Sequence, residues 1–253
     1  MARSMYQDLY NYEDSHWWFV GRRRIVFSIL NKYLPVVNSQ LRLLDVGCGT
    51  GANLTRLEKY GHATGVDISE EAIKFCQFRS CKDVFQIGKG SLPFDDNTFD
   101  VVTVLDVIEH IDDDYAALCE YYRVTKENGI LLITVPAYNF LWGPHDVISR
   151  HKRRYVATEL KDKVQGVGFA IEKITYFETF LFPFVFLSLM KEKLIENITG
   201  KSTCAIWVRD HTYLVNKLLG FIFSLEARFL ERFDFRYGVL LLCVARKFNT
   251  KQF

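Results

Sequence analysis

A glycine-rich turn directly after a short apolar segment is the feature that most restricts the fold of this chain. Leu41–Val46 is predicted to be a strand, and Gly47, Gly49 and Gly51 follow it before a helix predicted over 53–60. Glycines lack a Cβ, so they permit a tight turn and let a ligand approach the backbone closely. The helix then offers free N–H groups to an anionic group. The pattern predicts an α/β fold with a ligand beyond the carboxyl end of this strand.

Two acids narrow the choice of ligand. A second strand, predicted over 63–67, ends at Asp67, whose two carboxylate oxygens suit the two hydroxyls of a ribose. Gly47-x-Gly49-x-x-Ala52 also fits the dinucleotide fingerprint in its GxGxxA form, so the glycines favour NAD and S-adenosylmethionine (SAM) about equally. Asp45 favours SAM, because a carboxylate repels a pyrophosphate and attracts the ammonium group of a methionine moiety.

Apolar runs and helical patterns alternate along the rest of the chain, which favours a parallel sheet with crossover helices. Helices are expected after Ser69, a plausible N-cap, and over 115–126. Further strands are expected at 84–87, 99–105, 130–135, 169–176 and 238–247.

Three parts are expected from these patterns. Residues 1–40 form an N-terminal helical cap, 41–178 and 237–248 form the ligand-binding domain, and 179–236 form a hydrophobic helical insertion. The longest charge-free apolar run, 179–190, is broken by Pro183 and is too short to span a bilayer. The insertion is interpreted in three ways: a lid over an apolar acceptor, a homodimer interface, or a peripheral membrane patch.

Charge and cysteine content exclude some classes of protein. The net charge is +2, so no global field demands a polyanionic partner. The six cysteines contain no CxxC pair, which argues against a zinc site or a disulfide framework. The first eight residues lack the apolar core of a signal peptide. A cytoplasmic protein is expected, with peripheral membrane contact left open.

Four ordered blocks resemble class I SAM-dependent methyltransferases of the small-molecule branch. They read LLDVGCGTG at 43–51, GVDIS at 65–69, SLPFDDNTFDVV at 91–102 and VIEHI at 107–111. The segment YGVLLL at 237–242 resembles the antiparallel last strand of that family. The resemblance implies a Rossmann-like, seven-stranded, mostly parallel sheet with an antiparallel last strand and helices on both faces. It also implies an enzyme that transfers a methyl group from SAM.

The resemblance assigns a set of cofactor-binding residues. The glycines would hold the methionine end, Asp67 the ribose and Ile68 one face of the adenine, while the segment 105–107 would pass beside the sulfonium. Many family members place an acid shortly before the LPF block, but residues 87–91 read IGKGS, so Ser91 or backbone groups would take its role. The full set is Asp45, Gly47, Cys48, Gly49, Gly51, Asp67, Ile68, Ser91, Leu92, Leu105, Asp106 and Val107.

Three histidines are candidates for the base that a hydroxyl acceptor needs. His110 follows the predicted fourth strand, and His145 and His151 follow the fifth, so all three leave the carboxyl edge of the sheet. Asp146 stands beside His145 in the sequence. For each histidine the alternative is a structural role; for His110 it is packing and capping.

A metal site is a weaker alternative. Asp106-x-x-Glu109-His110 with a later histidine resembles the magnesium-ligand pattern of plant small-RNA 2′-O-methyltransferases, with Asp106 in place of a glutamate. Carboxylates suit magnesium, whereas imidazole is a softer ligand. The Glu-His pair is also common in metal-free relatives, so no metal is assigned.

The lead-in 12–23 and the segment 136–155 resemble a bacterial and archaeal methyltransferase group linked to surface-glycan and lipid biosynthesis. Trp18, Arg22, Tyr138 and Arg153 are therefore expected at the acceptor, where guanidinium groups suit a phosphate or carboxylate. For the arginines, the alternative is charge on a helix surface.

The function expected is methyl transfer from SAM to a small or lipid-linked acceptor, at oxygen. Three alternatives stay open. An RNA methyltransferase is disfavoured by the weak net charge and the lack of an RNA-binding module. The others are a non-catalytic SAM-binding partner subunit and an NAD-dependent oxidoreductase.

Overall fold

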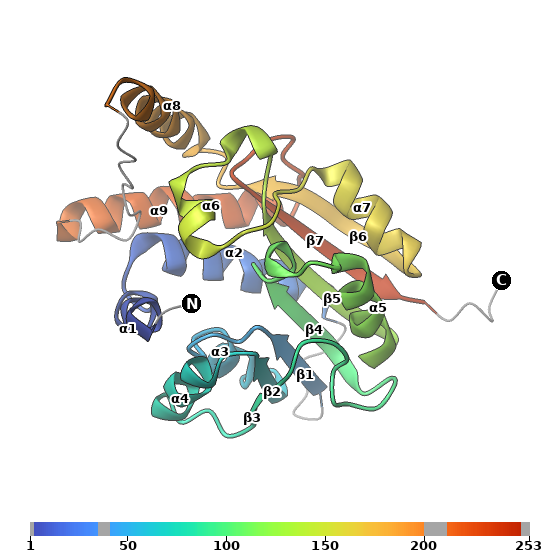
Figure 1. The fold of residues 1–253 in the computed structure, drawn as a ribbon. Coiled ribbons are helices and arrows are strands. Elements are labelled where there is room, and N and C mark those ends of the chain that lie inside the picture. Colours follow the sequence, from blue (N-terminus) through green and yellow to red (C-terminus); the bar gives the residue numbers. More distant parts are fainter. Residues whose placement is uncertain (1–2, 35–40, 200–211, 249–253) are drawn as a thin grey trace.

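The computed structural model describes residues 3–34, 41–199 and 212–248, and within them seven strands form one sheet (Figure 1). The strand order is β3-β2-β1-β4-β5-β7-β6. The first five strands are parallel, and β7 runs antiparallel to both of its neighbours. The strands are β1 (Leu41–Val46), β2 (Gly61–Asp67), β3 (Val84–Gln86), β4 (Phe99–Leu105), β5 (Thr125–Pro136), β6 (Phe169–Phe177) and β7 (Leu240–Lys247). The predicted fold class is confirmed.

Helices cover both faces of the sheet (Figure 1). One apolar core joins the sheet to α2, α3, α4 and α9, and the second joins it to α5 and α7. The α-helices are α1 (Arg3–Tyr12), α2 (Trp17–Tyr33), α3 (Leu54–Leu57), α4 (Glu70–Phe78), α5 (Asp114–Val124), α6 (Pro144–Ser149), α7 (Ala157–Gly166), α8 (Phe182–Thr199) and α9 (Tyr213–Leu230). Alternation along β1 explains the two cores, because Leu43 belongs to the first and Leu44 to the second.

The N-terminal lead-in consists of two helices that meet at a break after Tyr12. His16 ends this break as the N-cap of α2, and its Nδ1 accepts a hydrogen bond from the Trp18 amide at 3.3 Å. The break lets α1 turn away from α2 and lie against α4, where Tyr6 packs with Phe75.

The two helices of the segment 179–236 differ in their packing. α9 lies along α2, and Gly21 permits the contact, because a Cβ there would lie 2.5 Å from Cδ1 of Phe223. α8 carries the exposed side chains of Phe184, Leu187 and Leu194. No helix in the described parts of the chain is both long and apolar enough to cross a membrane.

The cysteines within the described residues are free thiols. Cys204 lies outside the described residues.

The strand order reverses at β1, which has β2 on one side and β4 on the other. In open parallel sheets, ligands bind beyond the carboxyl ends of the strands at such a reversal. The glycine turn that follows Val46 lies at this position.

Candidate functional site

A cavity of about 1630 Å³ opens at the carboxyl edge of the sheet. Its wall is built from α1, the start of α2, the glycine turn, the segments after β2 and β4, and the segment after β5. Val185 and Leu189 of α8 also line it. Segments that are far apart in the sequence therefore meet around one space.

The glycine turn has a backbone conformation that residues other than glycine adopt only with strain. Gly47, Gly49 and Gly51 have φ of +69°, +56° and +88°, in the left-handed region that favours glycine. A Cβ on Gly47 would lie 2.4 Å from Cγ2 of Val107, so the turn packs closely on the loop after β4. Gly49 has room for a Cβ, because the nearest atom to one added there is Cδ2 of Leu9 at 3.9 Å, an ordinary van der Waals distance.

Asp67 joins the end of β2 to the glycine turn. One of its carboxylate oxygens accepts a hydrogen bond from the Gly49 amide at 3.0 Å, and the other accepts one from the Ser69 amide at 2.8 Å. Burial raises the pKa of Asp67, and these amides counteract the shift. Each oxygen keeps a second lone pair, and the side chain lines the cavity. Beside it Ile68 is 59% exposed and also lines the cavity.

Asp45 lies beneath the turn and does not line the cavity. Its Oδ1 accepts a hydrogen bond from the hydroxyl of Thr103 at 2.7 Å. Burial raises the pKa of Asp45 to about 7. Gly51 is also outside the cavity wall. It packs against the side chain of Cys81, because a Cβ added to Gly51 would lie 2.9 Å from Sγ of Cys81. The structure thus places these two residues behind the cavity wall rather than in it.

The remaining residues predicted to bind the cofactor line the cavity, namely Cys48, Ser91, Leu92, Leu105, Asp106 and Val107. Among them Asp106 has a left-handed φ of +57°. Its carboxylate is 2.7 Å from the Arg22 guanidinium and accepts a hydrogen bond from the Thr134 hydroxyl at 2.9 Å. Arg22 also lies 5.3 Å from the centre of the Trp18 ring. Two residues expected at the acceptor, Trp18 and Arg22, are thus at the cavity, but the charge of Arg22 is neutralised by Asp106.

Tyr138 and Arg153, which were expected at the acceptor, do not line the cavity. Tyr138 stacks on Tyr176, with ring centroids 4.9 Å apart and planes within 7°. Arg153 forms an ion pair with Asp114 at 3.0 Å. Both side chains therefore have structural partners elsewhere.

The three candidate histidines all line the cavity. The ring centroids of His110 and His151 are 4.8 Å apart, and those of His145 and His151 are 5.8 Å apart. Burial lowers the pKa of His110 and of His145. Both imidazoles are therefore neutral near pH 7 and able to accept a proton.

Asp146 pairs with His151 rather than with its sequence neighbour His145. Its Oδ1 is 2.7 Å from Nδ1 of His151, and both of its oxygens accept hydrogen bonds from Arg154, at 2.9 and 3.0 Å. Burial would raise the pKa of Asp146, but these contacts lower it to about 2. The helical turn of α6 explains why Asp146 pairs with His151. The backbone at the end of α6 brings His151 close to Asp146, and the His151 amide donates a hydrogen bond to the Asp146 carbonyl.

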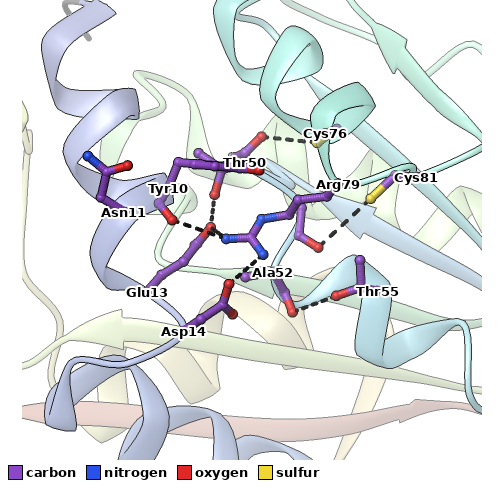
Figure 2. Close-up of polar contacts among 12 residues, drawn as sticks. Tyr10, Asn11, Glu13, Asp14, Thr50, Ala52, Thr55, Cys76, Arg79 and Cys81 are labelled. Carbon is purple, nitrogen blue, oxygen red and sulfur yellow. Dashed lines mark hydrogen bonds and ion pairs between the residues drawn. The ribbon is translucent and has the colours of Figure 1, made fainter.

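Glu13 is a buried residue at this site that the sequence analysis missed. It follows α1, and its carboxylate accepts a hydrogen bond from the hydroxyl of Thr50 in the glycine turn (Figure 2). Arg79 at the end of α4 lies 2.8 Å from the same carboxylate and 2.6 Å from that of Asp14. Burial raises the pKa of Glu13, and Thr50, Arg79 and Arg23 oppose that shift. The only sequence signal was the acidic pair Glu13-Asp14 in an aromatic lead-in.

Known proteins that are similar to this chain include methyltransferases. Residues 44–133 match the model of a family described as a methyltransferase domain. An uncharacterized methyltransferase of Schizosaccharomyces pombe is 38% identical over 113 residues, which cover 38% of this chain and 40% of that protein. The chain carries a class I SAM-dependent methyltransferase domain.

Curated relatives of this methyltransferase domain include enzymes named for quinone biosynthesis. A demethylmenaquinone methyltransferase of Tropheryma whipplei is 31% identical over 126 residues, 48% of each chain. A ubiquinone biosynthesis O-methyltransferase of Pelagibacter ubique is 28% identical over 112 residues, which cover 42% of this chain and 46% of that protein. The chain thus matches less than half of the length of these relatives.

Solved structures show the same fold as this methyltransferase domain. A SAM-dependent methyltransferase from Archaeoglobus fulgidus has a TM-score of 0.53 at 22% identity, covering 89% of this chain and 94% of that one. The phosphoethanolamine N-methyltransferase 2 of Haemonchus contortus, in complex with SAM, has a TM-score of 0.55 at 19% identity, covering 88% of this chain and 52% of that one. SAM is the cofactor of this domain family.

Proposed function

We propose that this chain transfers a methyl group from SAM to an oxygen of a small or lipid-linked acceptor. One observation carries the proposal: the glycine turn, Asp67 and the three histidines line the same cavity. A cofactor held over the turn and an acceptor near the histidines would share this one cavity. Alignment of two reactants in this way accounts for about 7–11 kcal/mol of a reaction barrier in favourable cases.

The residues around the turn fit SAM. At Gly49 the nearest atom to an added Cβ is 3.9 Å away and no side chain is present, so a ligand can approach the backbone. Asp67 keeps an acceptor lone pair on each oxygen for the ribose hydroxyls. Asp45 lies beneath the turn and would act on the ammonium group through water. When bound, SAM supplies the electrophilic methyl group.

The acceptor side of the cavity is partly apolar. Val185 and Leu189, from the insertion, line the cavity together with Leu240 of β7. This supports the interpretation of the segment 179–236 as a lid. The names of the relatives from T. whipplei and P. ubique refer to quinone chemistry, which favours a small, apolar acceptor for this chain as well.

The histidines would remove the proton of an acceptor hydroxyl. His145 lines the cavity, and the hydroxyl oxygen of Ser149 lies 3.4 Å from its Nε2. His151 has one nitrogen occupied by Asp146, and His110 has one at 3.4 Å from the Arg150 carbonyl. We therefore assign the role of base to His145, with His110 and His151 at its side.

The test uses SAM labelled in its methyl group and fractionated cell extract as the source of acceptor. The native chain should label a small or lipid-soluble product, and His145→Ala should lower the rate at least tenfold without weakening SAM binding in a calorimetric titration. His62→Ala is the control, because His62 is exposed and contacts Asp83 away from the cavity. Labelling of RNA, or SAM binding without any labelling, would contradict the proposal. An unchanged rate in His145→Ala would remove that residue as the base.

A further inference from the structure

A buried carboxylate without a partner lies in the wall of the cavity. Glu109 is in the 3₁₀ turn Ile108–His110 after β4, and its side chain is 0% exposed. Within the described residues, neither of its carboxylate oxygens has a hydrogen-bond partner. A buried polar group left unpaired is costly, so such a group in a native fold indicates a missing ligand or ion.

Two imidazoles face this carboxylate. One nitrogen or oxygen atom each from Glu109, His110 and His151 lie within 4.8 Å of one another. The loop carrying His151 is held there by the backbone, because the Lys152 amide donates a hydrogen bond to the Glu109 carbonyl at 2.8 Å. The three groups therefore come from two separate segments, the turn after β4 and the loop after α6.

The second nitrogen of each imidazole is occupied by an oxygen. Nδ1 of His151 contacts the Asp146 carboxylate at 2.7 Å, and Nδ1 of His110 lies 3.4 Å from the Arg150 carbonyl. Metal-binding histidines usually donate their other N–H group to a carboxylate or a carbonyl, which orients the ring. Both rings thus have supporting contacts of the kind that metal ligands have, and in such a site the Nε2 atoms would bind the ion.

We propose that Glu109, His110 and His151 bind a divalent transition metal of the Zn²⁺ type. Two imidazoles and one carboxylate are the donors that Zn²⁺ and its neighbours in the first row accept, whereas Mg²⁺ takes oxygen ligands. A metal ion would neutralise the unpaired Glu109 carboxylate. The three protein ligands leave coordination positions on the cavity side, as in catalytic zinc sites.

Asp106 is not part of this set. Its carboxylate is bound by Arg22 and Thr134, so the sequence pattern Asp106-x-x-Glu109-His110 does not describe the ligands that the fold brings together. His151 is the later histidine of that pattern, 41 residues after His110. Without Asp106 the set has one carboxylate and two imidazoles, which shifts the preference from magnesium to zinc.

Such an ion would contribute to methyl transfer in the cavity. This role rests on the proposed function, whereas the binding of the metal does not. An acceptor hydroxyl bound at an open coordination position loses its proton more easily. His145, whose ring lies 5.8 Å from that of His151, is outside the ligand set and remains available to accept this proton.

The experiment titrates Co²⁺, as a spectroscopic probe for Zn²⁺, into the chain purified with a chelator and without SAM. The native chain should show visible absorption bands that saturate at one equivalent, and one equivalent of Zn²⁺ should remove them. Glu109→Gln should weaken Co²⁺ binding at least tenfold. This variant should fold, because the Glu109 side chain has no hydrogen bond to lose. His151→Ala should weaken binding similarly, whereas the exposed His62→Ala should leave it unchanged.

A second measurement is thermal unfolding. One equivalent of Zn²⁺ should raise the melting temperature of the native chain and leave that of Glu109→Gln unchanged, since an ion that binds only the folded state stabilises it. No saturable Co²⁺ binding, or binding that Glu109→Gln does not weaken, would overturn the proposal. Calorimetric titration with SAM is independent of this result, so a failed metal site and a failed cofactor site are distinguishable.

Discussion

The carboxylate of Glu13 accepts a hydrogen bond from the hydroxyl of Thr50, which connects the N-terminal helices to the glycine turn (Figure 2). Thr50 stands between Gly49 and Gly51, so this contact acts on the backbone that would hold the cofactor. Arg79 extends the connection to α4 through its 2.8 Å contact with Glu13. The position of α1 over the cavity is thus coupled to the conformation of the turn.

The first prediction concerns this connection. Glu13→Ala should lower the free energy of unfolding by about 1–3 kcal/mol, because it leaves the buried Thr50 hydroxyl and part of Arg79 without an acceptor. It should also weaken SAM binding, since the turn loses its contact with α1. Chemical denaturation and calorimetric titration measure the two effects.

Asp14→Asn is the matched control for Glu13→Ala. Asp14 also pairs with Arg79, at 2.6 Å, but its side chain is 59% exposed. Exposed ion pairs contribute little, so this variant should change stability by less than about 1 kcal/mol. An equal loss in both variants would show that Arg79, rather than the Thr50 contact, determines the effect.

The second prediction compares two glycines of the turn. Gly47→Ala and Gly49→Ala both place a side chain on a left-handed backbone, which costs about 1–2 kcal/mol. Only Gly47→Ala also drives a Cβ to within 2.4 Å of Val107. We expect Gly47→Ala to be the less stable variant in urea denaturation by at least about 1 kcal/mol. Equal stability would mean that the loop after β4 moves away freely.

The third prediction concerns the pH dependence of cofactor binding. Burial raises the pKa of Asp45 to about 7, so its charge develops as the pH rises through neutrality. The ionised form attracts the ammonium group of SAM. SAM affinity should therefore increase between pH 6 and pH 8, and Asp45→Asn should bind weakly with no such increase. Parallel pH profiles of the two chains in calorimetric titrations would contradict this role, and tight binding of NAD would contradict the proposed cofactor.

The central strands were predictable from the sequence because most of their residues are apolar and buried. Phe99–Leu105 is a nearly continuous apolar run, Leu41–Val46 has four apolar residues of six, and the structure has both strands with the predicted bounds. The helix predicted over 53–60 is shorter, Leu54–Leu57, because the chain tightens there into a turn in which the Tyr60 amide donates to the Leu57 carbonyl. Local sequence patterns thus predict which segments form strands and helices, whereas the residues at which these elements end depend on hydrogen bonds in the turns.

The polar partners at the site were not predictable in the same way. Asp146 stands beside His145 in the sequence, but the fold returns the chain so that His151 and Arg154 bind it. Glu13 reaches Thr50 across 37 residues. Such pairs depend on tertiary packing between segments, and one sequence carries no periodic signal for them. The same reason explains why Tyr138 and Arg153 were expected at the cavity and lie outside its wall.

The last prediction concerns a buried acid that joins α2 to the end of β6. Glu178 follows β6, and its side chain accepts a hydrogen bond from the Trp18 ring nitrogen at 3.1 Å. Burial raises its pKa to about 8, while an unfolded glutamate titrates near 4.3. The protonated Glu178 contributes its full amount to the free energy of unfolding below the pKa of the unfolded chain. That contribution is lost as the pH rises toward and through the pKa of the folded chain, at up to about 1.4 kcal/mol per pH unit. Glu178→Gln, which keeps an acceptor oxygen but has no proton to lose, should therefore melt at a temperature that falls less between pH 5 and pH 8 than that of the native chain. Glu58→Gln, at an exposed position, is the control and should show the native dependence of melting temperature on pH. If the melting temperature of Glu178→Gln falls with pH as much as that of Glu58→Gln, Glu178 is ionised in the folded chain.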